Sequence, residues 1–158
     1  MNKLFFILGN QLFNPEIIKN HGCNEIFMSE DFGLCTYEKH HKLKIYLFLC
    51  AMREYKDELV SNGLNVHYYT LNDRKKDQNY LSFFNDFISS HNFEEINFFE
   101  IEDKPFEKDI INGFKSNSIN YKIHSSPMFM FEKDEFRDFN KNNKVYRLSS
   151  FYQYGRKK

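Results

Sequence analysis

The sequence predicts an α/β protein built around a mostly parallel sheet, and three observations lead to this expectation. Short apolar runs typical of strands recur along the chain, segments with helical spacing separate them, and Gly residues close several of these elements. Strands that alternate with helices in this way are parallel and joined by right-handed crossovers. The expected fold is therefore a doubly wound, Rossmann-like sheet of five strands with helices on both faces.

Five segments carry the strand pattern. The first, residues 4–8, is a continuous apolar run that Gly9 closes, which is typical of a strand buried on both faces. The other four are runs rich in Ile, Phe, Tyr and Val, at residues 25–28, 65–71, 96–101 and 121–123.

Helical signals lie between the expected strands. Asn14 and Pro15 have the pattern of an N-cap followed by Pro at the first helical position. Apolar residues recur at helical spacing from about residue 40 to 62, and Gly63 stands where a helix C-cap belongs. Further helices are expected at residues 81–90, 105–114 and 132–140. Residues 31–39 are expected to form a loop, and residues 146–158 a mixed aromatic and basic tail.

Length and composition predict one compact domain inside the cell. The 158 residues suit a single domain over residues 1–130, followed by a helical or linker segment over residues 131–158. The 22 basic and 22 acidic residues balance, which argues against a dedicated binder of nucleic acid or of membrane surfaces. The three cysteines form no C-x-x-C pair, and no apolar stretch approaches the roughly 20 residues of a membrane span. A cytoplasmic protein with reduced thiols is expected.

Polar residues follow the expected strands, at residues 9–11, 29–31, 72–73 and 100–103. In an open parallel sheet such residues share the edge where ligands bind. The chain has no G-x-G-x-x-G or P-loop motif, which argues against NAD binding of the usual kind and against P-loop hydrolysis. No G-x-S-x-G elbow or Cys–His pair indicates a catalytic site, and the adjacent His40 and His41 lack the spacing of a zinc pair. No catalytic or metal-binding residue is therefore assigned.

Two segments are candidates for ligand binding, each with a plainer alternative. Gly9 would let a ligand approach the backbone, and the amides of Asn10 and Gln11 suit the edge of a heteroaromatic ring. The alternative is that these residues only form a turn. The basic run at residues 39–44 enters the long helix, where its charge opposes the helix dipole. Either neighbouring carboxylates such as Glu30, or an anionic ligand, would offset that charge, unless the run is simply solvated.

Four blocks of the sequence resemble a known family. Residues 7–12, I-L-G-N-Q-L, resemble the I-L-G-D-Q-L opening of the photolyase-related proteins, a branch of the cryptochrome/photolyase superfamily that includes bacterial (6-4) photolyases with an iron–sulfur cluster. Residues 36–45, T-Y-E-K-H-H-K-L-K-I, followed by A-M-R at 51–53, resemble its second block. The triplet E-F-R at 135–137 and the pair F-Y at 151–152 continue the match in the same order. The resemblance runs from about residue 3 to the last residue.

The resemblance implies a light-harvesting role. Such proteins have an N-terminal α/β domain that carries an antenna chromophore, 6,7-dimethyl-8-ribityllumazine, and a larger helical domain that holds FAD, the iron–sulfur cluster and the DNA-lesion pocket. This chain resembles the N-terminal domain alone, and it has no Trp and no four-cysteine set. It is therefore expected to need an FAD-binding photolyase domain, fused or separate, as its partner. Contact with DNA would come only through that domain, and this chain alone is not expected to catalyse repair.

By resemblance, eight residues would line the antenna pocket: Gly9, Asn10, Gln11, Leu12, Ser29, Glu30, Tyr37 and His40. Tyr37 would stack on the ring, while Gln11 and Glu30 would hydrogen-bond its polar edge or ribityl chain.

Two positions depart from the family pattern and imply an altered or lost chromophore. Asn10 stands where Asp is usual, and Leu34 stands where Glu is frequent. Two alternative functions are a stand-alone nucleotide- or flavin-binding regulatory domain and a small enzyme that uses the acidic strand ends.

Overall fold

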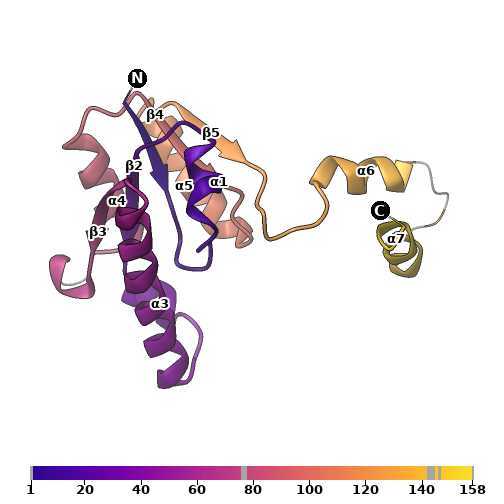
Figure 1. Ribbon diagram of the computed structural model, residues 1–158, viewed down its shortest axis with the longest axis horizontal. Helices are drawn as coiled ribbons and strands as arrows, with labels where there is room; N and C mark the ends of the chain where they lie inside the picture. The colour runs from indigo at the N-terminus through magenta and orange to yellow at the C-terminus, as the bar shows by residue number, and fades with distance from the viewer. Residues whose placement is uncertain (1, 76–77, 142–144, 146, 158) are drawn as a thin grey trace. The chain divides into compact units, whose positions relative to one another are not determined.

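The computed structural model describes residues 2–75, 78–141, 145 and 147–157. Its contacts divide the chain into two units, residues 1–124 and residues 125–158. The first unit holds a five-stranded sheet (Figure 1), whose strands are β1 (Lys3–Phe6), β2 (Glu25–Ser29), β3 (Asn65–Tyr69), β4 (Glu95–Phe99) and β5 (Tyr121–His124). Every pairing is parallel, and the strand order is β3-β2-β1-β4-β5. The predicted α/β, Rossmann-like sheet is confirmed.

The strand order fixes the point at which the winding reverses. The chain runs outward from β1 through β2 to β3, and then returns to place β4 on the other side of β1. The loops that leave β1 and β4 therefore diverge to opposite faces of the sheet. Such a switch point opens a crevice at the carboxyl ends of these strands.

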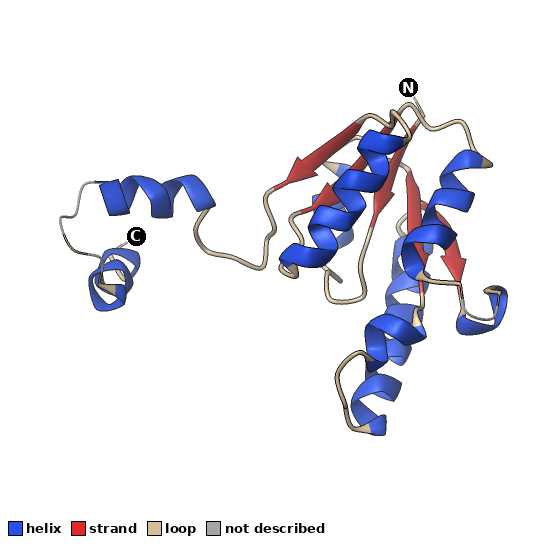
Figure 2. Ribbon diagram, turned by 180° about the vertical axis from the view of Figure 1, so that it is seen from behind, coloured by secondary structure: helices blue, strands red, loops and turns tan. Residues whose placement is uncertain are grey.

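Helices cover both faces of the sheet (Figure 2). Side chains alternate along β1, so that Leu4 and Phe6 pack with α4 (Tyr80–Ser89) and α5 (Lys104–Ser116), in one core cluster. Phe5 and Ile7 pack on the opposite face with α1 (Pro15–Lys19) and α3 (Lys42–Ser61). The two clusters make the sheet the central layer of three.

Local signals explain where the helices begin and end. The Asn14 side chain accepts a hydrogen bond from the N–H of Glu16 (2.9 Å), as the predicted N-cap requires. The long helix ends before Gly63, which has a φ of +81° in the left-handed region, as the predicted C-cap requires.

One prediction about residues outside the main elements was wrong, and a second segment, expected only to be helical or a linker, has a defined helix. Residues 31–39 contain a short helix, α2 (Phe32–Thr36), because the Asp31 side chain caps it by accepting from the N–H of Leu34 (2.7 Å). The predicted tail contains α7 (Leu148–Gly155) in the second unit. Its Phe151 ring packs on Phe136 of the expected helix α6 (Lys133–Lys141), with centroids 4.9 Å apart. This aromatic contact gives the helix a partner that local sequence does not reveal.

Candidate functional site

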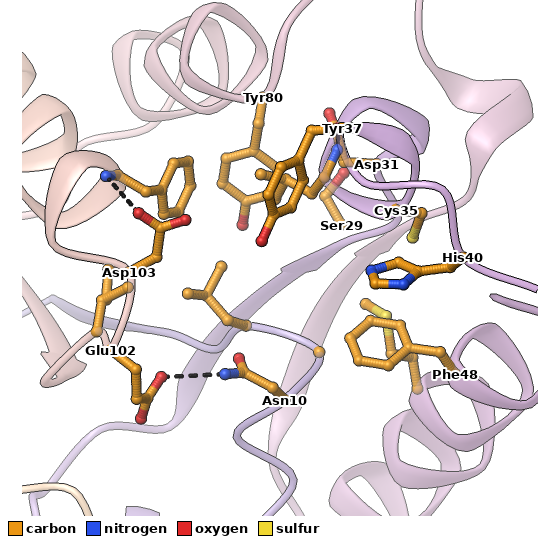
Figure 3. Close-up of a pocket in the computed structure, with 16 residues that line it drawn as sticks. Asn10, Ser29, Asp31, Cys35, Tyr37, His40, Phe48, Tyr80, Glu102 and Asp103 are labelled. Atoms are coloured by element: carbon orange, nitrogen blue, oxygen red, sulfur yellow. Dashed lines mark hydrogen bonds between the residues drawn. The ribbon is translucent and has the colours of Figure 1, made fainter. Parts of the chain in front are cut away.

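A cleft of about 370 Å³ lies at the switch point, at the carboxyl ends of β1, β2 and β4 (Figure 3). This volume falls within the range usual for small-molecule sites. Its lining is Leu8, Gly9, Asn10, Ser29, Asp31, Leu34, Cys35, Tyr37, His40, Phe48, Met52, Tyr80, Ile101, Glu102, Asp103 and Phe106. Loops after three strands and the first turns of α4 and α5 thus contribute to a single cavity.

Gly9 lies in the turn after β1, where α3 packs very closely. The turn is closed by the N–H of Gln11, which donates to the carbonyl of Leu8 (2.9 Å). A Cβ on Gly9 would lie 2.5 Å from the ring of Phe48 and 2.6 Å from the sulfur of Met52. Among the described residues, left-handed glycine conformations occur only at Gly22 and Gly63, so Gly9 serves close packing within a turn rather than a special backbone angle.

Asn10 joins the β1 loop to the β4 loop. Its amide Nδ2 donates to Oε2 of Glu102 (3.0 Å), across 92 residues of sequence, as the dashed line in Figure 3 shows. The other carboxyl oxygen, Oε1, is buried and has no hydrogen-bond partner within the described part of the chain. Asn10 can donate this bond, whereas an ionised Asp could not. The departure from the family pattern at this position therefore suits Glu102.

Ser29, Asp31 and Tyr80 form the part of the cleft nearest β2. Asp31 is 8% exposed and pairs with the guanidinium of Arg74, whose side chain is 6% exposed. Tyr80 is 4% exposed, and its hydroxyl has no partner among the described residues. Burial, and secondarily the charge of Asp31, raises the pKa of Tyr80 far above its usual value. The hydroxyl therefore keeps its proton and can donate a hydrogen bond to a ligand.

The wall opposite Glu102 and Asp103 in Figure 3 is aromatic and weakly polar. It contains Cys35 of α2, Phe48 of α3, and Tyr37 and His40, which lie between these two helices. Tyr37 is 69% exposed, so its ring is free to cover a ligand. Burial, together with the nearby Asp31 and Glu30 carboxylates, raises the pKa of the Cys35 thiol. This thiol is therefore protonated at neutral pH and is a poor nucleophile.

The structure brings five of the eight predicted residues together in the cleft: Gly9, Asn10, Ser29, Tyr37 and His40. Gln11, Leu12 and Glu30 lie outside its lining. Gln11 is buried, and its amide donates to the carbonyl of Glu100 (2.9 Å), while Leu12 packs against the core on the α1 and α3 face.

Glu30 is the centre of a buried network beside the cleft. Its fully buried carboxylate accepts from Nε of Arg53 (2.6 Å), Nη2 of Arg53 (3.1 Å), the hydroxyl of Tyr68 (2.8 Å) and the N–H of Leu71 (3.0 Å). Burial by itself would raise the pKa of Glu30, but the hydrogen bonds from Arg53, Tyr68 and Leu71 outweigh burial and lower it. Through these hydrogen bonds, the carboxylate of Glu30 at the end of β2 is linked to β3 and α3.

Other cleft residues had no signal in the sequence. Phe48, Met52, Tyr80 and Phe106 belong to helices whose apolar periodicity indicates core packing, and only the fold brings them to the strand ends. The sequence indicates Glu102 and Asp103 only as polar residues after a strand. Only the folded structure shows that the hydroxyl of Tyr80 is buried without a partner among the described residues.

The charge of the cleft limits what it can bind. Glu102 and Asp103 supply carboxylates, Asp31 is paired with Arg74 behind the lining, and no Lys or Arg lines the cleft within the described residues. Such a lining favours ligands that donate hydrogen bonds and opposes phosphate groups.

In the same described ranges, no group of three or more His, Cys, Asp or Glu could hold a metal ion. Of the helices that the structure describes, none has both the length and the apolar character to cross a membrane.

The all-parallel, doubly wound sheet with a polar and aromatic cleft at its switch point defines a Rossmann-like α/β domain. The chain belongs to the deoxyribodipyrimidine photo-lyase-related protein family, whose model matches residues 5–158. It is also 35% identical, over 77 residues, to a (6-4) photolyase from Agrobacterium fabrum (strain C58 / ATCC 33970). That match covers 46% of this chain and 15% of the relative, so the chain corresponds to a small part of that protein's length.

Proposed function

We propose that this chain binds a lumazine-type antenna chromophore in the switch-point cleft and passes its excitation energy to a flavin held by an FAD-binding photolyase domain. One observation carries the proposal. The two blocks that most resemble the family are separated along the chain, yet both reach this cleft, Gly9 and Asn10 from the first and Tyr37 and His40 from the second.

The residues present suit a flat heterocycle with a hydroxylated chain. Tyr37, His40 and Phe48 offer aromatic faces for stacking on a ring. The hydroxyl of Tyr80 and one oxygen of Glu102 have no partner in the described part of the chain, and they offer a donor and an acceptor for the polar atoms of a ligand. The bound chromophore would supply only light absorption, and the protein would hold and shield it.

The two alternative functions gain no specific support. A nucleotide- or flavin-binding domain holds a phosphate through cations or through backbone N–H groups at a helix N-terminus, and no Lys or Arg lines the cleft among the described residues. The enzyme alternative names Glu30 and Asp73 among the acidic strand ends, and neither offers a free carboxylate. Glu30 is bonded within its network, and Asp73 accepts from the N–H and the hydroxyl of Thr70 (both 2.7 Å).

The proposal is tested by titrating the full chain with 6,7-dimethyl-8-ribityllumazine and with FMN, followed by absorption and fluorescence. We expect stoichiometric uptake of the lumazine and a Tyr37→Ala variant that binds it roughly threefold to tenfold more weakly, the usual value of an aromatic stacking contact. Tyr46→Ala is a matched control, because Tyr46 is also 69% exposed but does not line the cleft.

Absence of lumazine uptake by the folded chain would contradict the proposal, and tight uptake of FMN alone would favour the flavin-binding alternative. Energy transfer is tested separately. Adding an FAD-binding photolyase domain should quench the fluorescence of the bound lumazine, and unchanged fluorescence in a formed complex would argue against a light-harvesting role.

A further inference from the structure

The long helix α3 has apolar side chains on two opposite faces of its first half. One face carries Phe48 and Met52, which line the cleft. On the other face Leu43, Tyr46 and Leu47, spaced i, i+3 and i+4, form one stripe, and these side chains are 63%, 69% and 69% exposed. This half of α3 projects beyond the carboxyl ends of the strands (Figure 1), which leaves the stripe open to solvent. A contiguous apolar stripe on a solvent-facing helix indicates a contact with another protein surface.

The charges of α3 run in the order that its own dipole disfavours. Lys42 and Lys44 stand in the first turn, which contains no acidic residue, and the last turn contains no basic residue. Glu54 and Glu58 lie in the second half of the helix. A helix is stabilised by the opposite order, with anions near its start and cations near its end. The two ends of α3 are therefore complementary in charge, but they cannot meet within one helix.

These charges are available for contacts outside the helix. Among the described residues, no ion pair involves the two lysines of the first turn or the carboxylates of Glu54 and Glu58. The cations of the second half are already neutralised, because Arg53 pairs with the buried Glu30 and Lys56 pairs with Asp57. The first turn of α3 is thus positive, and the exposed surface of its second half is negative.

We propose that α3 pairs with α3 of a second copy of this chain, in antiparallel orientation, about a two-fold axis that passes between Leu47 and Cys50. In such an interface every contact occurs twice. Leu47 of one copy faces Cys50 of the other, so the two apolar stripes cover each other. Lys42 and Lys44 of each copy lie within one helical turn of Glu54 of the other. The antiparallel orientation also places the positive end of each helix dipole beside the negative end of the other.

A second copy accounts for the whole exposed face of α3, whereas other occupants account for one part of it. An anion or a nucleic acid would neutralise Lys42 and Lys44, but Glu54 and Glu58 would repel it, and the apolar stripe would stay uncovered. The interface does not depend on the proposed function, because the cleft lies on the opposite face of the helix.

The oligomeric state of the full chain, measured by sedimentation equilibrium over a range of concentrations, tests this interface. We expect a reversible dimer whose Kd rises with salt, because the charged pairs at its rim are screened. Leu47→Asp brings two carboxylates together near the axis and should raise the Kd roughly a hundredfold or more. Val60→Asp is the matched control, because Val60 is also an exposed apolar residue of α3 but lies outside the stripe. It should leave the Kd within about threefold of wild type.

Reversing charges shows whether the contact is made with a second copy. Lys44→Glu and Glu54→Lys should each raise the Kd roughly fivefold to twentyfold, because each change replaces two symmetric opposite-charge contacts by like-charge contacts. Mixing the two single variants should restore a dimer of wild-type affinity, since each variant then supplies the charge that the other needs. Neither variant should lower the Tm of the monomer by more than about 2 °C, because both side chains are exposed.

Three results would overturn the proposal. The first is a wild-type chain that stays monomeric at millimolar concentration. The second is a dimer that Leu47→Asp leaves intact, and the third is a pair of charge variants that do not recover on mixing. If an FAD-binding photolyase domain covers the stripe instead, the chain alone is monomeric and Leu47→Asp weakens only that complex, which also rejects the second copy.

Discussion

Glu30→Gln offers a direct test of whether Glu30 holds the fold together or contacts a ligand. The buried carboxylate accepts hydrogen bonds from Arg53, Tyr68 and Leu71. Gln keeps only one accepting oxygen and turns an NH₂ group toward donors, so about half of these bonds are lost. Hydrogen bonds to charged groups contribute roughly 1.5–3 kcal/mol each, but the Arg53 side chain is 55% exposed and can turn to water. We therefore expect a loss of about 2–3 kcal/mol in the free energy of unfolding.

Urea or thermal unfolding of the ligand-free chain measures this loss, which corresponds to a Tm lower by roughly 5–10 °C. Lumazine affinity, measured well below that Tm, should stay within about twofold of wild type because Glu30 does not line the cleft. Glu54→Gln, an exposed change on α3, is the control and should alter neither quantity. A variant with wild-type stability that no longer binds lumazine would refute this reasoning and restore Glu30 as a ligand contact.

The pH dependence of the Glu30 network has a definite sign. The pKa of Glu30 is lowered in the folded protein, so its stabilising contribution is present above the unfolded value of 4.5 and is lost as the pH falls through the folded value. Wild type and Glu30→Gln should therefore approach each other in stability below this range. A difference that stays constant from neutral to strongly acidic pH would contradict the network.

Three further predictions concern other sites. Burial, with smaller effects of His21 and Lys122, lowers the pKa of His124 from 6.5 to about 4. The stability of the folded chain should therefore be full above pH 6.5 and fall by up to about 3 kcal/mol toward pH 4. Urea unfolding midpoints of wild type and His124→Gln across this pH range measure the fall. Gly9→Ala should displace the α3 side chains over the turn, lower stability by about 1–3 kcal/mol and weaken lumazine binding; unchanged unfolding and affinity would show that the cleft tolerates a Cβ there. Asn10→Asp should lose its bond to Glu102 and cost about 1–2 kcal/mol at neutral pH through like-charge contact, an effect that should shrink in acid as measured by thermal unfolding.

Much of the fold could be predicted from the sequence because its signals are local. Apolar runs mark the strands, helical spacing marks α3, α4 and α5, and caps such as Asn14 and Gly63 mark helix ends. The helix α2 was missed because Gly33 lies within a helix of five residues, where little apolar periodicity can develop. The bounds of α7 could not be predicted, because its packing depends on an aromatic partner in α6.

The candidate site was less predictable because its contacts are distant in sequence. Side chains alternate near the end of β2, so Ser29 and Asp31 reach the cleft while Glu30 points to the other side. The alternation of side chains along β2 predicts that Glu30 lies outside the cleft, whereas the resemblance placed Glu30 in the pocket. The bond between Asn10 and Glu102 joins two strand ends that become neighbours only when β4 returns beside β1, and no local pattern indicates that event.

The hydroxyl of Tyr80, which has no partner among the residues that the structure describes, also bears on how long the protein survives in a cell. A ligand that binds only the folded chain shifts the folding equilibrium away from the unfolded form by mass action, by about 2.7 kcal/mol at a concentration one hundred times its Kd. Proteases and chaperones act on that form, and a change of about 1–2 kcal/mol can alter protein abundance several-fold. A ligand that satisfied this hydroxyl would extend the lifetime of the chain, so chromophore supply would set the amount of loaded protein without a separate regulator.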